Sequence, residues 1–389
     1  SWAGAAVAEL RALLAGGGTA GHVNPLRATA DRLAALPGGA DLTVLGTAEG
    51  LESRLVPEAG LPLRIVPRTP LPRRPSLDLL RLPGRLRAAV RAGAGAVAEA
   101  GGGVAAEAIT ATRAQVVVGF GGYVATPAYL AARRLGVPVV IHEQNARPGL
   151  ANRLGARWAR YVAVTFPGTP LPRATLTGLP LRPAIADLVA ERAADTAARR
   201  RAGAAALGLD PERTTLLVTG GSLGAQRIND AVAAGAAALD EAGVQVLHLT
   251  GHGKDEPVRS ATSGLRHYHV RPYLDDMASA YAAADLVLCR AGAGTVSELA
   301  ALGLPAVYVP LPIGNGEQRR NAAGVVAAGG GTIVADADLT ADYVTGPLRA
   351  LLADRERLAE MGRAAAGAGI RDGAARLAEL VVRAARERT

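Results

Sequence analysis

The sequence contains few cysteines, few aromatic residues and no long apolar run, and each shortage excludes a class of protein. A single cysteine, Cys289, excludes an intramolecular disulfide and any metal site built from several cysteines, as is typical of a reducing cytoplasm. Aromatic residues make up 3% of the chain, so a nucleic-acid surface based on base stacking is poorly supplied. With no apolar run of about 18 residues and no signal-peptide pattern, we expect a soluble or at most peripheral protein.

The chain is basic, with 43 lysine and arginine residues against 34 acidic ones and a formal net charge of +9. Such a balance can indicate nucleic acid or an anionic membrane as a partner. Here only one basic residue is a lysine, Lys254, and alanine, glycine, arginine and leucine dominate throughout. We therefore attribute the charge to a general composition bias and predict no nucleic-acid partner.

One sequence pattern occurs twice along the chain, as LLAGGGTAGHVNPLRATADRLAAL at 13–36 and as LLVTGGSLGAQRINDAVAAGAAAL at 216–239. Each copy reads as a buried strand, a glycine-rich turn and an amphipathic helix. The first N–H groups of such a helix have no partner within the helix and point at the turn, so each copy can bind a phosphate or another anion. The repetition predicts two nucleotide-binding halves that face one cleft.

Short runs rich in valine and leucine alternate with helical segments, which indicates parallel sheets covered by helices on both faces. A proline-rich stretch at 177–185 ends the first series of strands. We predict an α/β protein with two doubly wound domains, 8–180 and 181–367, and a last helix over 368–386. A polar, arginine-rich helix over 187–203 is expected to open the second domain, and the tail is expected to break near 367–373.

Gly16, Gly18 and Gly21 satisfy the G-x-G-x-x-G pattern of dinucleotide-binding proteins after a predicted strand. Such spacings arise often in a chain rich in alanine and glycine. A NAD-binding unit also needs an acidic residue at the end of its second strand. The candidate here, Glu49, lies a few residues beyond the predicted end of that strand. A nucleotide-linked oxidoreductase is therefore only an alternative, which bound NADH or flavin in the purified protein would support.

A sharper pattern lies at 290–310, RAGAGTVSELAALGLPAVYVP, followed by GNGEQRRNA at 314–322. A strand ends there, glycines allow a ligand to approach the backbone, and a helix is expected to begin at Thr295. Glu298 then lies one turn inside the helix, where its carboxylate can accept hydrogen bonds from a ribose diol. Thr295 and Glu298 also match a capping box, which only stabilises the helix, and the spacing does not separate the two interpretations.

His22 closes the first glycine loop at the start of a predicted helix, where the helix dipole lowers the pKa of an imidazole and favours its action as a base. A histidine in this place can also be no more than a polar cap. His142, Glu143, Gln144 and Asn145 end a predicted buried strand in the sequence IHEQN. Because α/β proteins hold ligands at the carboxyl ends of parallel strands, this cluster indicates a functional site.

Two further groups have weaker support. Gln318 and Asn321 lie three residues apart on a predicted helix, where they could bind sugar hydroxyls or could only be solvated. The sequence DAD at 336–338 has the form that metal-dependent sugar transferases use, but it reads better as a strand end followed by a helix cap. We predict no metal site and no cofactor.

Residues 64–91 carry eight arginines and one acid, Asp78, with leucines interleaved. This composition suits a peripheral surface that touches anionic lipid. An ordinary amphipathic helix in an arginine-rich chain would have the same composition, so both interpretations stay open.

Together these residues resemble the MurG family, the UDP-N-acetylglucosamine transferases that complete the lipid-linked peptidoglycan precursor. The resemblance covers most of the chain through the motifs GGGTAGHVNP, GFGGYVATP, IHEQN, TGLPLR, VTGGSLGAQRIN, YLDDM, GAGTVSE and GEQRRNA. It implies a GT-B fold with two Rossmann-like domains, an acceptor-binding one at 8–180 and a donor-binding one at 181–367. It also implies that the final helix, 368–386, packs back on the first domain.

The resemblance implies a reaction as well. N-acetylglucosamine moves from UDP-GlcNAc to the 4-hydroxyl of the MurNAc-pentapeptide of undecaprenyl diphosphate, lipid I, with inversion to a β-1,4 bond. The product is lipid II for peptidoglycan synthesis, and the implied location is the cytoplasmic face of a bacterial cell membrane. Such a transferase needs no metal, because Arg182 and helix-end N–H groups can stabilise a diphosphate leaving group.

The matching motifs imply the site residues. Donor contacts are implied for Thr19, Ala20, Gly21, Asn145, Arg182, Ser222, Leu274, Ala293, Gly294, Thr295, Val296, Ser297, Glu298 and Gln318. Within this set, Glu298 holds the ribose, Leu274 the uracil, Ser222 with Arg182 the diphosphate, and Gln318 with Asn145 the transferred sugar. The acceptor side comprises the loop from Thr19 to His22 together with Gly121, Gly122, Tyr123 and His142.

His22 is the first candidate for the general base, and Glu143 and His142 are the other candidates. Ala20, Leu179 and Gly294 depart from the usual pattern of the family, which puts details of the acceptor loop in question but not the family. Two more alternatives stay open. One is another GT-B transferase with a lipid or small-molecule acceptor, and the other is a non-catalytic protein that binds a sugar nucleotide.

Overall fold

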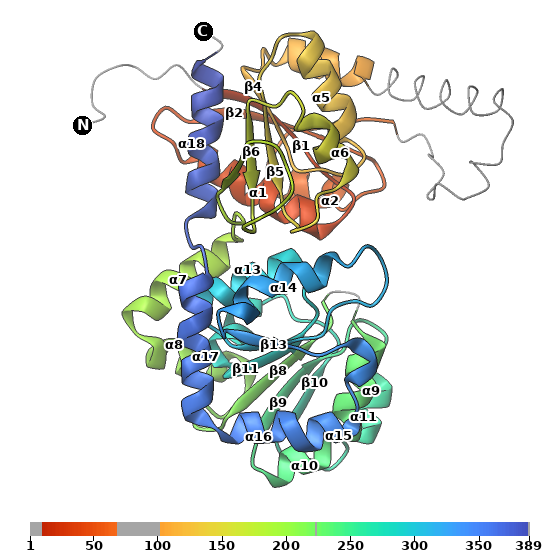
Figure 1. Cartoon of the computed structure of the whole chain (residues 1–389), viewed down its shortest axis with the longest axis vertical. Helices are drawn as coiled ribbons and strands as arrows, with labels where there is room; N and C mark the ends of the chain where they lie inside the picture. The colour runs from red at the N-terminus through yellow and green to blue at the C-terminus, as the bar shows by residue number, and fades with distance from the viewer. Residues whose placement is uncertain (1–9, 68–101, 222–223, 388–389) are drawn as a thin grey trace, which may run out of the picture. The chain divides into compact units, whose positions relative to one another are not determined.

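The structure is a computed structural model that describes residues 10–67, 102–221 and 224–387. It divides into two compact units, which are described separately here (Figure 1). Unit 1 comprises Ser1–Gln144, Pro148–Pro180 and Asp372–Thr389, and unit 2 comprises Asn145–Arg147 and Leu181–Arg371. Of the arginine-rich segment 64–91, the structure describes only residues 64–67.

Unit 1 is built on a parallel sheet of seven strands in the order β3-β2-β1-β4-β5-β6-β7. Leu13 and Val117 enter the core on one face of this sheet. Leu14 and Val118, the next residues along the same strands, enter the core on the other face, so both faces are buried. The strands are β1 (Leu10–Ala15), β2 (Ala40–Gly46), β3 (Leu63–Ile65), β4 (Val116–Gly119), β5 (Val139–Glu143), β6 (Tyr161–Val164) and β7 (Ala174–Leu176).

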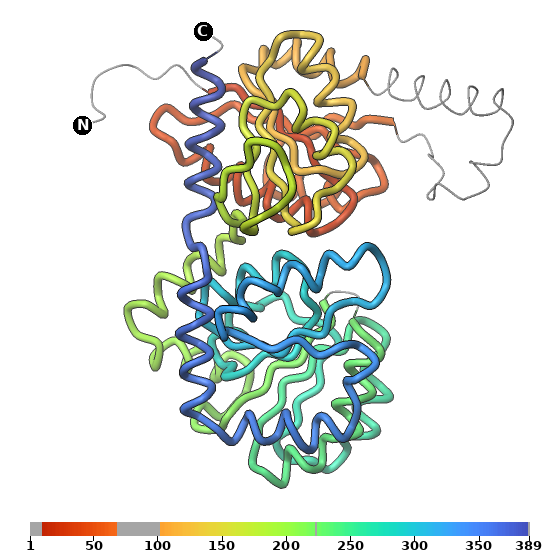
Figure 2. Tube along the Cα trace, in the orientation of Figure 1, coloured from red at the N-terminus to blue at the C-terminus, as the bar shows by residue number. Residues whose placement is uncertain are grey.

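Helices cover the sheet of unit 1, and the last of them comes from the far end of the chain. In Figure 2 this helix, α18, lies at the blue end of the trace beside the red N-terminal segments, and it packs against α1. Gly373 allows the close approach at its start, because a Cβ there would lie 2.5 Å from the carbonyl oxygen of Leu179. The helices are α1 (Ala20–Ala34), α2 (Glu52–Glu58), residues 102–111, α5 (Ala125–Arg134), α6 (Leu150–Gly155) and α18 (Gly373–Arg386).

Unit 2 has a parallel sheet of six strands in the order β10-β9-β8-β11-β12-β13. The strands are β8 (Thr215–Thr219), β9 (Gln245–Leu249), β10 (Tyr268–Arg271), β11 (Leu286–Cys289), β12 (Ala306–Tyr308) and β13 (Gly331–Ile333). Cys289 is buried, and burial raises the pKa of its thiol above the usual value.

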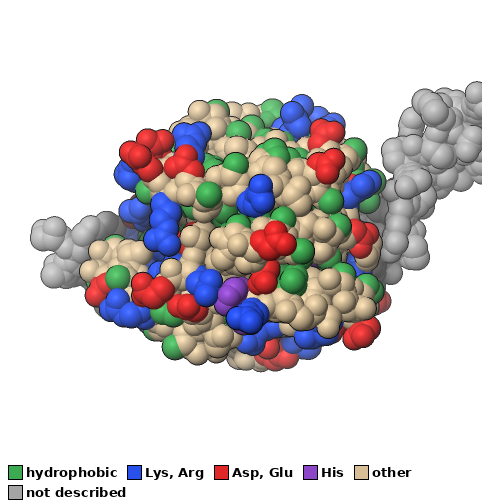
Figure 3. All heavy atoms as spheres, turned by 90° about the horizontal axis from the view of Figure 1, so that it is seen from below, with side chains coloured by type: hydrophobic (Ala, Val, Ile, Leu, Met, Phe, Trp, Pro, Cys, Tyr) green, Lys and Arg blue, Asp and Glu red, His purple; other side chains and the backbone are tan. Residues whose placement is uncertain are grey.

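The helices of unit 2 surround this sheet. They are α7 (Pro183–Ala194), α8 (Thr196–Leu207), α9 (Gln226–Ala234), α10 (Ala236–Glu241), α11 (Asp255–Ala261), α12 (Met277–Ala283), α13 (Ala293–Leu302), α14 (Glu317–Ala327), α15 (Ala341–Tyr343), α16 (Arg349–Ala353) and α17 (Arg355–Ala368). A 3-10 turn, Asp336–Asp338, precedes α15, and a π-helical turn, Val344–Leu348, follows it. On the face drawn in Figure 3, basic and acidic side chains are interspersed rather than gathered by sign.

The predicted fold class is confirmed, because both sheets are parallel and alternate with helices. The single helix predicted over 187–203 is wrong, since two helices, α7 and α8, occupy this stretch. Asp195 separates them and caps α8, where its carboxylate accepts a hydrogen bond from the N–H of Ala198 at 2.9 Å. The predicted break in the tail is confirmed between α17 and α18.

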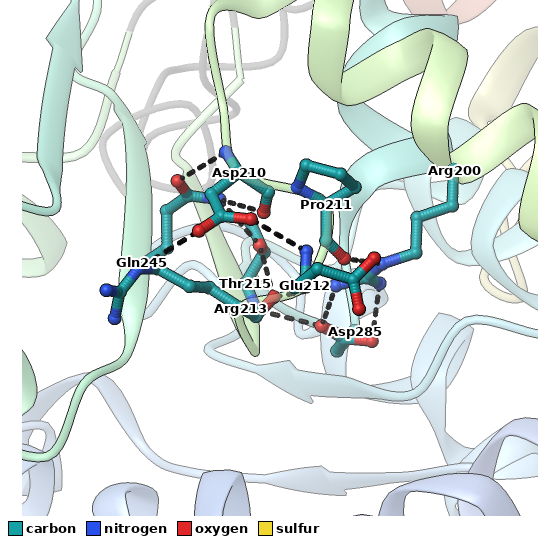
Figure 4. A network of polar contacts seen from close by, with 8 residues as sticks. All are labelled: Arg200, Asp210, Pro211, Glu212, Arg213, Thr215, Gln245 and Asp285. Carbon is teal, nitrogen blue, oxygen red and sulfur yellow. Dashed lines mark hydrogen bonds and ion pairs between the residues drawn. The ribbon is translucent and has the colours of Figure 1, made fainter.

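A polar network joins α8 to the start of the second sheet (Figure 4). Arg200 donates to both carboxylate oxygens of Asp285, at 2.7 and 2.9 Å. The same guanidinium donates to the carbonyl oxygens of Pro211 and Arg213, both at 2.7 Å. Asp285 also accepts from the N–H of Thr215, the first residue of β8, at 2.8 Å. The network therefore fixes α8 to the edge where β8 and β11 begin.

We expect Asp285→Ala to lower the free energy of unfolding by about 2 kcal/mol, because it removes the charged partner of Arg200 and leaves the Thr215 N–H without an acceptor. The side chains of Arg200 and Asp285 are 22% and 30% exposed, so solvent screens part of the loss. Urea denaturation measures the change. Glu360→Ala, which breaks an exposed ion pair with Arg357, is the control, and an equal effect of the two variants would contradict the prediction.

Candidate active site

The first glycine loop of unit 1 joins β1 to α1, and a buried carboxylate holds it in place. Gly18 has a φ of +88°, which favours glycine, and Thr19 takes the N-cap position of α1. Glu52, the first residue of α2, is fully buried, and its Oε2 accepts a hydrogen bond from the N–H of Gly18 at 2.7 Å. Its Oε1 accepts from the N–H and the hydroxyl of Thr47, at 2.8 and 2.7 Å. The loop is therefore tied to the residue that follows β2.

This carboxylate argues against a dinucleotide site at the first glycine loop. Burial acts to raise the pKa of Glu52, but hydrogen bonds from Gly18 and Thr47 lower it below its usual value, so the group is ionised. The carboxylate already occupies the Gly18 N–H, which the pyrophosphate of a dinucleotide would otherwise bind in this type of loop. Glu49, the acid considered from the sequence, is exposed and does not take this place.

His22 lies in the first turn of α1 and is oriented by the same loop. Its Nδ1 lies 3.1 Å from the carbonyl oxygen of Gly17 and 3.2 Å from the hydroxyl of Thr19. The contact with Gly17 assigns the proton to Nδ1 and leaves Nε2 as the basic nitrogen. Burial lowers the pKa of His22, although the bond to Gly17 and the charge of Glu52 act to raise it. The direction agrees with the sequence prediction, but burial is its leading cause where the helix dipole was expected.

Gly121 and Gly122 pack against this ring and this loop. Both have a positive φ, +89° and +83°. A Cβ on Gly121 would lie 3.4 Å from Nε2 of His22, and a Cβ on Gly122 would lie 2.8 Å from the carbonyl oxygen of Gly17. The structure therefore brings His22 together with Gly121 and Gly122, and Tyr123 follows them as a partly exposed residue.

Glu143, at the end of β5, positions the start of α6. It is 2% exposed, and its Oε2 accepts from the N–H of Gly149 at 3.1 Å and from Nδ2 of Asn152 at 2.9 Å. Asn152 in turn accepts from the hydroxyl of Tyr129 at 2.7 Å. These contacts favour a structural task for this carboxylate over the role of a base.

His142 is held by both of its ring nitrogens. Nε2 lies 2.9 Å from the carbonyl oxygen of Gly178, and Nδ1 lies 3.1 Å from Nε2 of Gln144. Burial lowers the pKa of His142 to about 4, so the ring is neutral, donates to Gly178 and accepts from Gln144. A ring with both nitrogens engaged in the core is poorly suited to accept a proton from substrate.

In unit 2, the candidate donor site lies where β11 leads into α13. This helix begins at Ala293 with Gly292 as its N-cap, so the predicted start at Thr295 is wrong by two residues. Thr295 is therefore inside the helix and cannot serve as the N-cap of a capping box with Glu298. The capping-box interpretation is overturned, because the Glu298 carboxylate has other partners.

The buried carboxylate of Glu298 forms an ion pair with Arg182, whose side chain is partly exposed. The side chain of Glu298 is 7% exposed, and its two oxygens accept from Nε and Nη2 of Arg182 at 2.7 and 2.8 Å. The hydroxyl of Tyr281 lies 3.3 Å from Oε2 of the same carboxylate. Burial acts to lower the pKa of Arg182, but its bonds to Glu298 raise it, so the guanidinium stays charged. The family resemblance implied that Glu298 binds the ribose of the donor and Arg182 its diphosphate, whereas in the structure the two side chains bind each other.

Gln318 and Asn321 share one face of α14, as predicted, and both hold the loop that follows β11. Oε1 of Gln318 accepts from the N–H groups of Ala291 and Leu311, at 3.1 and 2.9 Å. Asn321, which is 1% exposed, donates to the carbonyl oxygen of Ala291 at 3.2 Å and to Oδ1 of Asn145 at 3.2 Å. Simple solvation of this pair is therefore excluded.

The second glycine loop precedes α9, and Ser222 within it lies outside the described residues. Gly224 has a φ of +67°, and a Cβ there would lie 2.0 Å from the carbonyl oxygen of Thr250. Nδ2 of Asn229 donates to the same carbonyl at 3.0 Å. The remaining donor candidates fall into a partly or fully exposed group (Thr19, Ala20, Gly21, Leu274, Gly294, Thr295, Ser297) and a buried one (Ala293, Val296).

The DAD sequence at 336–338 is a 3-10 turn after β13. Asp336 accepts from Nη1 of Arg290 at 2.6 Å, and its other oxygen lies 3.7 Å from Nε of Arg227. Within residues 10–67, 102–221 and 224–387, no group of three or more His, Cys, Asp or Glu side chains is placed to hold a metal ion. In the same ranges, no helix is both long and apolar enough to cross a membrane.

Three residues of these sites were missed in the sequence: Glu52, Asn152 and Tyr281. A signal exists for the first, because Glu52 and Val56 lie four residues apart on the same buried face of α2. A charged residue on an apolar helix face indicates a partner elsewhere in the fold. Asn152 and Tyr281 carry no such signal, since their partners are distant in sequence.

Comparison with known proteins identifies relatives over nearly the whole chain. Residues 12–164 match the glycosyltransferase family 28 N-terminal domain, and residues 215–377 match the glycosyltransferase family 28 C-terminal domain. A UDP-N-acetylglucosamine--N-acetylmuramyl-(pentapeptide) pyrophosphoryl-undecaprenol N-acetylglucosamine transferase from a Nocardioides species is 56% identical over 374 residues, which cover 96% of this chain and 98% of the relative.

Two more comparisons agree with this one. The transferase of the same description from Leifsonia xyli subsp. xyli is 55% identical over 369 residues, which cover 95% of this chain and 97% of the relative. The crystal structure of Acinetobacter baumannii MurG matches with a TM-score of 0.73 and 27% identity, and the match covers 96% of this chain and 99% of that one.

Proposed function

Since the chain belongs to the MurG family of glycosyltransferases, we propose that it transfers N-acetylglucosamine from UDP-GlcNAc to lipid I and so forms lipid II for peptidoglycan synthesis. The observation that carries this proposal is the identity of over 50% to such transferases along nearly the full length of the chain. We assign the acceptor to residues 8–180 with the last helix, and the donor to residues 181–367.

His22 is our candidate for the general base. Its Nε2 takes the proton of the acceptor 4-hydroxyl while that oxygen attacks the anomeric carbon of the donor sugar. The bond from the anomeric carbon to the UDP oxygen breaks, and its electron pair leaves with UDP, so the anomeric configuration inverts. The lowered pKa of His22 supports this role, because the ring is neutral at pH 7. Gly121 and Gly122, which lack side chains, leave Nε2 open to the acceptor.

Glu298 and Arg182 are our candidates for the donor's ribose and diphosphate. A carboxylate offers about four lone-pair positions, and Arg182 with Tyr281 takes three of them. A ribose diol needs two, so it competes with Arg182 for the carboxylate. We infer that donor binding separates the pair, and that the released guanidinium turns to the diphosphate, where it stabilises the leaving group. No metal is required for this step.

A transfer assay tests the function directly. Purified protein is mixed with UDP-GlcNAc and a short-chain lipid-linked muramoyl pentapeptide in the presence of chelator, and UDP release and disaccharide are followed. We expect a disaccharide that depends on the acceptor and forms despite the chelator. Tight binding of UDP-GlcNAc without product would reject this acceptor and favour another GT-B transferase or a non-catalytic binding protein.

We further propose that the segment 64–91 attaches the protein peripherally to the cytoplasmic face of the membrane through anionic lipid. Its sequence supports this, with arginines and leucines interleaved. Charge reversal at Arg73, Arg74 and Arg81, which lie outside the described residues, is expected to weaken binding to anionic phosphatidylglycerol vesicles by more than about tenfold. Vesicle sedimentation measures this.

The matched control reverses three exposed arginines of unit 2, Arg349, Arg355 and Arg363. This variant has the same net charge as the first but keeps the segment 64–91. Equal binding of the wild type to neutral phosphatidylcholine vesicles, or an equal loss in the two variants, would remove the proposal.

A further inference from the structure

A negative charge is buried under the first glycine loop, and the groups that satisfy it are neutral. The carboxylate of Glu52 is fully buried and accepts hydrogen bonds from the N–H of Gly18 and from the N–H and hydroxyl of Thr47. Burial of an ionised group costs free energy that neutral donors offset only in part. A carboxylate can accept from all of these donors, but it also places a negative charge under the loop, and this charge acts on the groups around it.

Three glycines surround the carboxylate of Glu52, and their lack of a side chain leaves room for it. A Cβ on Gly17 would lie 2.2 Å from its Oε1, and a Cβ on Gly50 would lie 2.0 Å from its Oε2. A Cβ on Gly46 would lie 2.6 Å from its Cγ. Real Cβ contacts do not approach so closely, so a side chain at any of these three positions would displace the carboxylate from the place that it occupies.

The carboxylate and His22 bind opposite ends of one peptide group. The N–H of Gly18, which donates to Glu52 at 2.7 Å, and the carbonyl of Gly17, which lies 3.1 Å from Nδ1 of His22, belong to the same planar unit. A negative charge at the N–H end polarises this unit and makes its carbonyl a stronger acceptor. The chain of contacts therefore runs from Glu52 through one peptide to the imidazole.

We propose that Glu52 is a positioning residue that acts on His22 through the Gly17–Gly18 peptide, an inference that rests on the proposed function of His22 as base. It holds the peptide so that Gly17 accepts the Nδ1–H, which keeps Nε2 unprotonated and open. When Nε2 takes the proton of the acceptor hydroxyl, the ring becomes an imidazolium and Nδ1 keeps its proton on Gly17. The Glu52 charge stabilises that cation, as the carboxylate does in a Ser-His-Asp triad, here with a peptide between.

The electrostatic surroundings of His22 make this role testable by pH. The charge of Glu52 acts to raise the pKa of His22, against the larger effect of burial. The Thr19 hydroxyl and the backbone of Gly121 and Gly122 also face the ring, with Tyr123 next along the chain. A second carboxylate, that of Glu143, lies further from His22. Asn152 lies between them, because it contacts Gly121 on one side and donates a hydrogen bond to Glu143 on the other.

Glu52→Gln is the main test, because it removes the charge and keeps the shape. We expect kcat to fall by about tenfold to a hundredfold, while the affinity for UDP stays at the wild-type value. The activity rises with pH as His22 loses its second proton, and this acid limb of the kcat profile should move to lower pH in the variant. Glu58→Gln, on the exposed side of the same helix, is the matched control and should change neither quantity.

Other outcomes separate the failure of this inference from the failure of the base assignment. A fall in kcat with an unmoved acid limb would show a merely structural role and overturn the inference. If His22→Ala keeps wild-type kcat and the acid limb, then the base assignment itself fails. Glu52→Asp keeps the charge, so its acid limb should stay at the wild-type pH while kcat falls.

A measurement on the wild-type protein keeps the test valid if Glu52→Gln does not fold. Nitrogen NMR of protein labelled in histidine reports which ring nitrogen of His22 carries the proton. We expect the Nδ1–H form at a pH above the pKa of His22. Observation of the Nε2–H form would overturn the proposed relay, whatever the variants do.

Discussion

Replacement of His22 by alanine is expected to lower kcat by about a thousandfold, within the range that a general base contributes. The acceptor hydroxyl would then lose its proton only to water as it attacks the donor sugar. The affinity for UDP should not change, because the donor candidates Glu298 and Arg182 belong to unit 2. Steady-state assay of UDP release measures kcat, and calorimetric titration with UDP measures the affinity.

The pH dependence of the wild-type enzyme gives the same prediction a second readout. A base must be neutral to accept a proton, so activity is lost as the pH falls through the pKa of His22. Because burial lowers that pKa, the loss should occur below the usual range of histidine, and the variant should lack this limb. His267→Ala, before β10 in unit 2, is a control that removes a histidine elsewhere. Wild-type kcat in His22→Ala would show that another group takes the proton.

Glu298→Ala is expected to weaken UDP binding by about a hundredfold, equivalent to about 2.7 kcal/mol, which is within the range for two hydrogen bonds to a carboxylate. The variant also leaves the Arg182 guanidinium without its buried partner, so thermal melting must be recorded beside the titration. Glu241→Ala, at the exposed end of α10, is a control that should bind UDP like the wild type.

A change in the ligand separates ribose contact from loss of structure. The wild type should bind 2′-deoxy-UDP more weakly than UDP, because the deoxy ligand lacks one donor to Glu298. In Glu298→Ala the two ligands should bind alike, as a double-mutant cycle requires when the two groups interact. Continued preference for UDP in the variant would place the ribose elsewhere and leave Glu298 as the structural partner of Arg182.

The sequence sufficed for features that depend on local pattern. Apolar strands such as 116–119 and the glycine loop before His22 follow from periodicity and turn chemistry, and the structure has both sheets in the predicted parallel form. The family resemblance implied that Gly121, Gly122 and His22 lie on one side of the site, and the structure brings these three residues together.

The sequence was insufficient where a partner lies far along the chain. Arg182 and Glu298 are 116 residues apart, and nothing in the residues around either one encodes their pairing. The start of α13 was misplaced because its N-cap is Gly292, which has no side chain to signal a helix end, while Thr295 offers a false one. Glu143 and His142 were correctly recognised as a polar cluster, but only their hydrogen bonds show that they hold α6 and the segment at Gly178.

Because α18 packs on unit 1, the two units cannot complete their folding in the order in which their first residues are synthesised. Leu377 and Val381 belong to the same core as Leu14 and Val118, so unit 1 is assembled from segments that are synthesised before and after most of unit 2. All of unit 2, including the short piece Asn145–Arg147, is synthesised before α18, so unit 2 can fold while one face of the unit 1 sheet is still without this helix. A chain truncated after residue 371 would therefore lack part of the core of unit 1 but would contain all of unit 2.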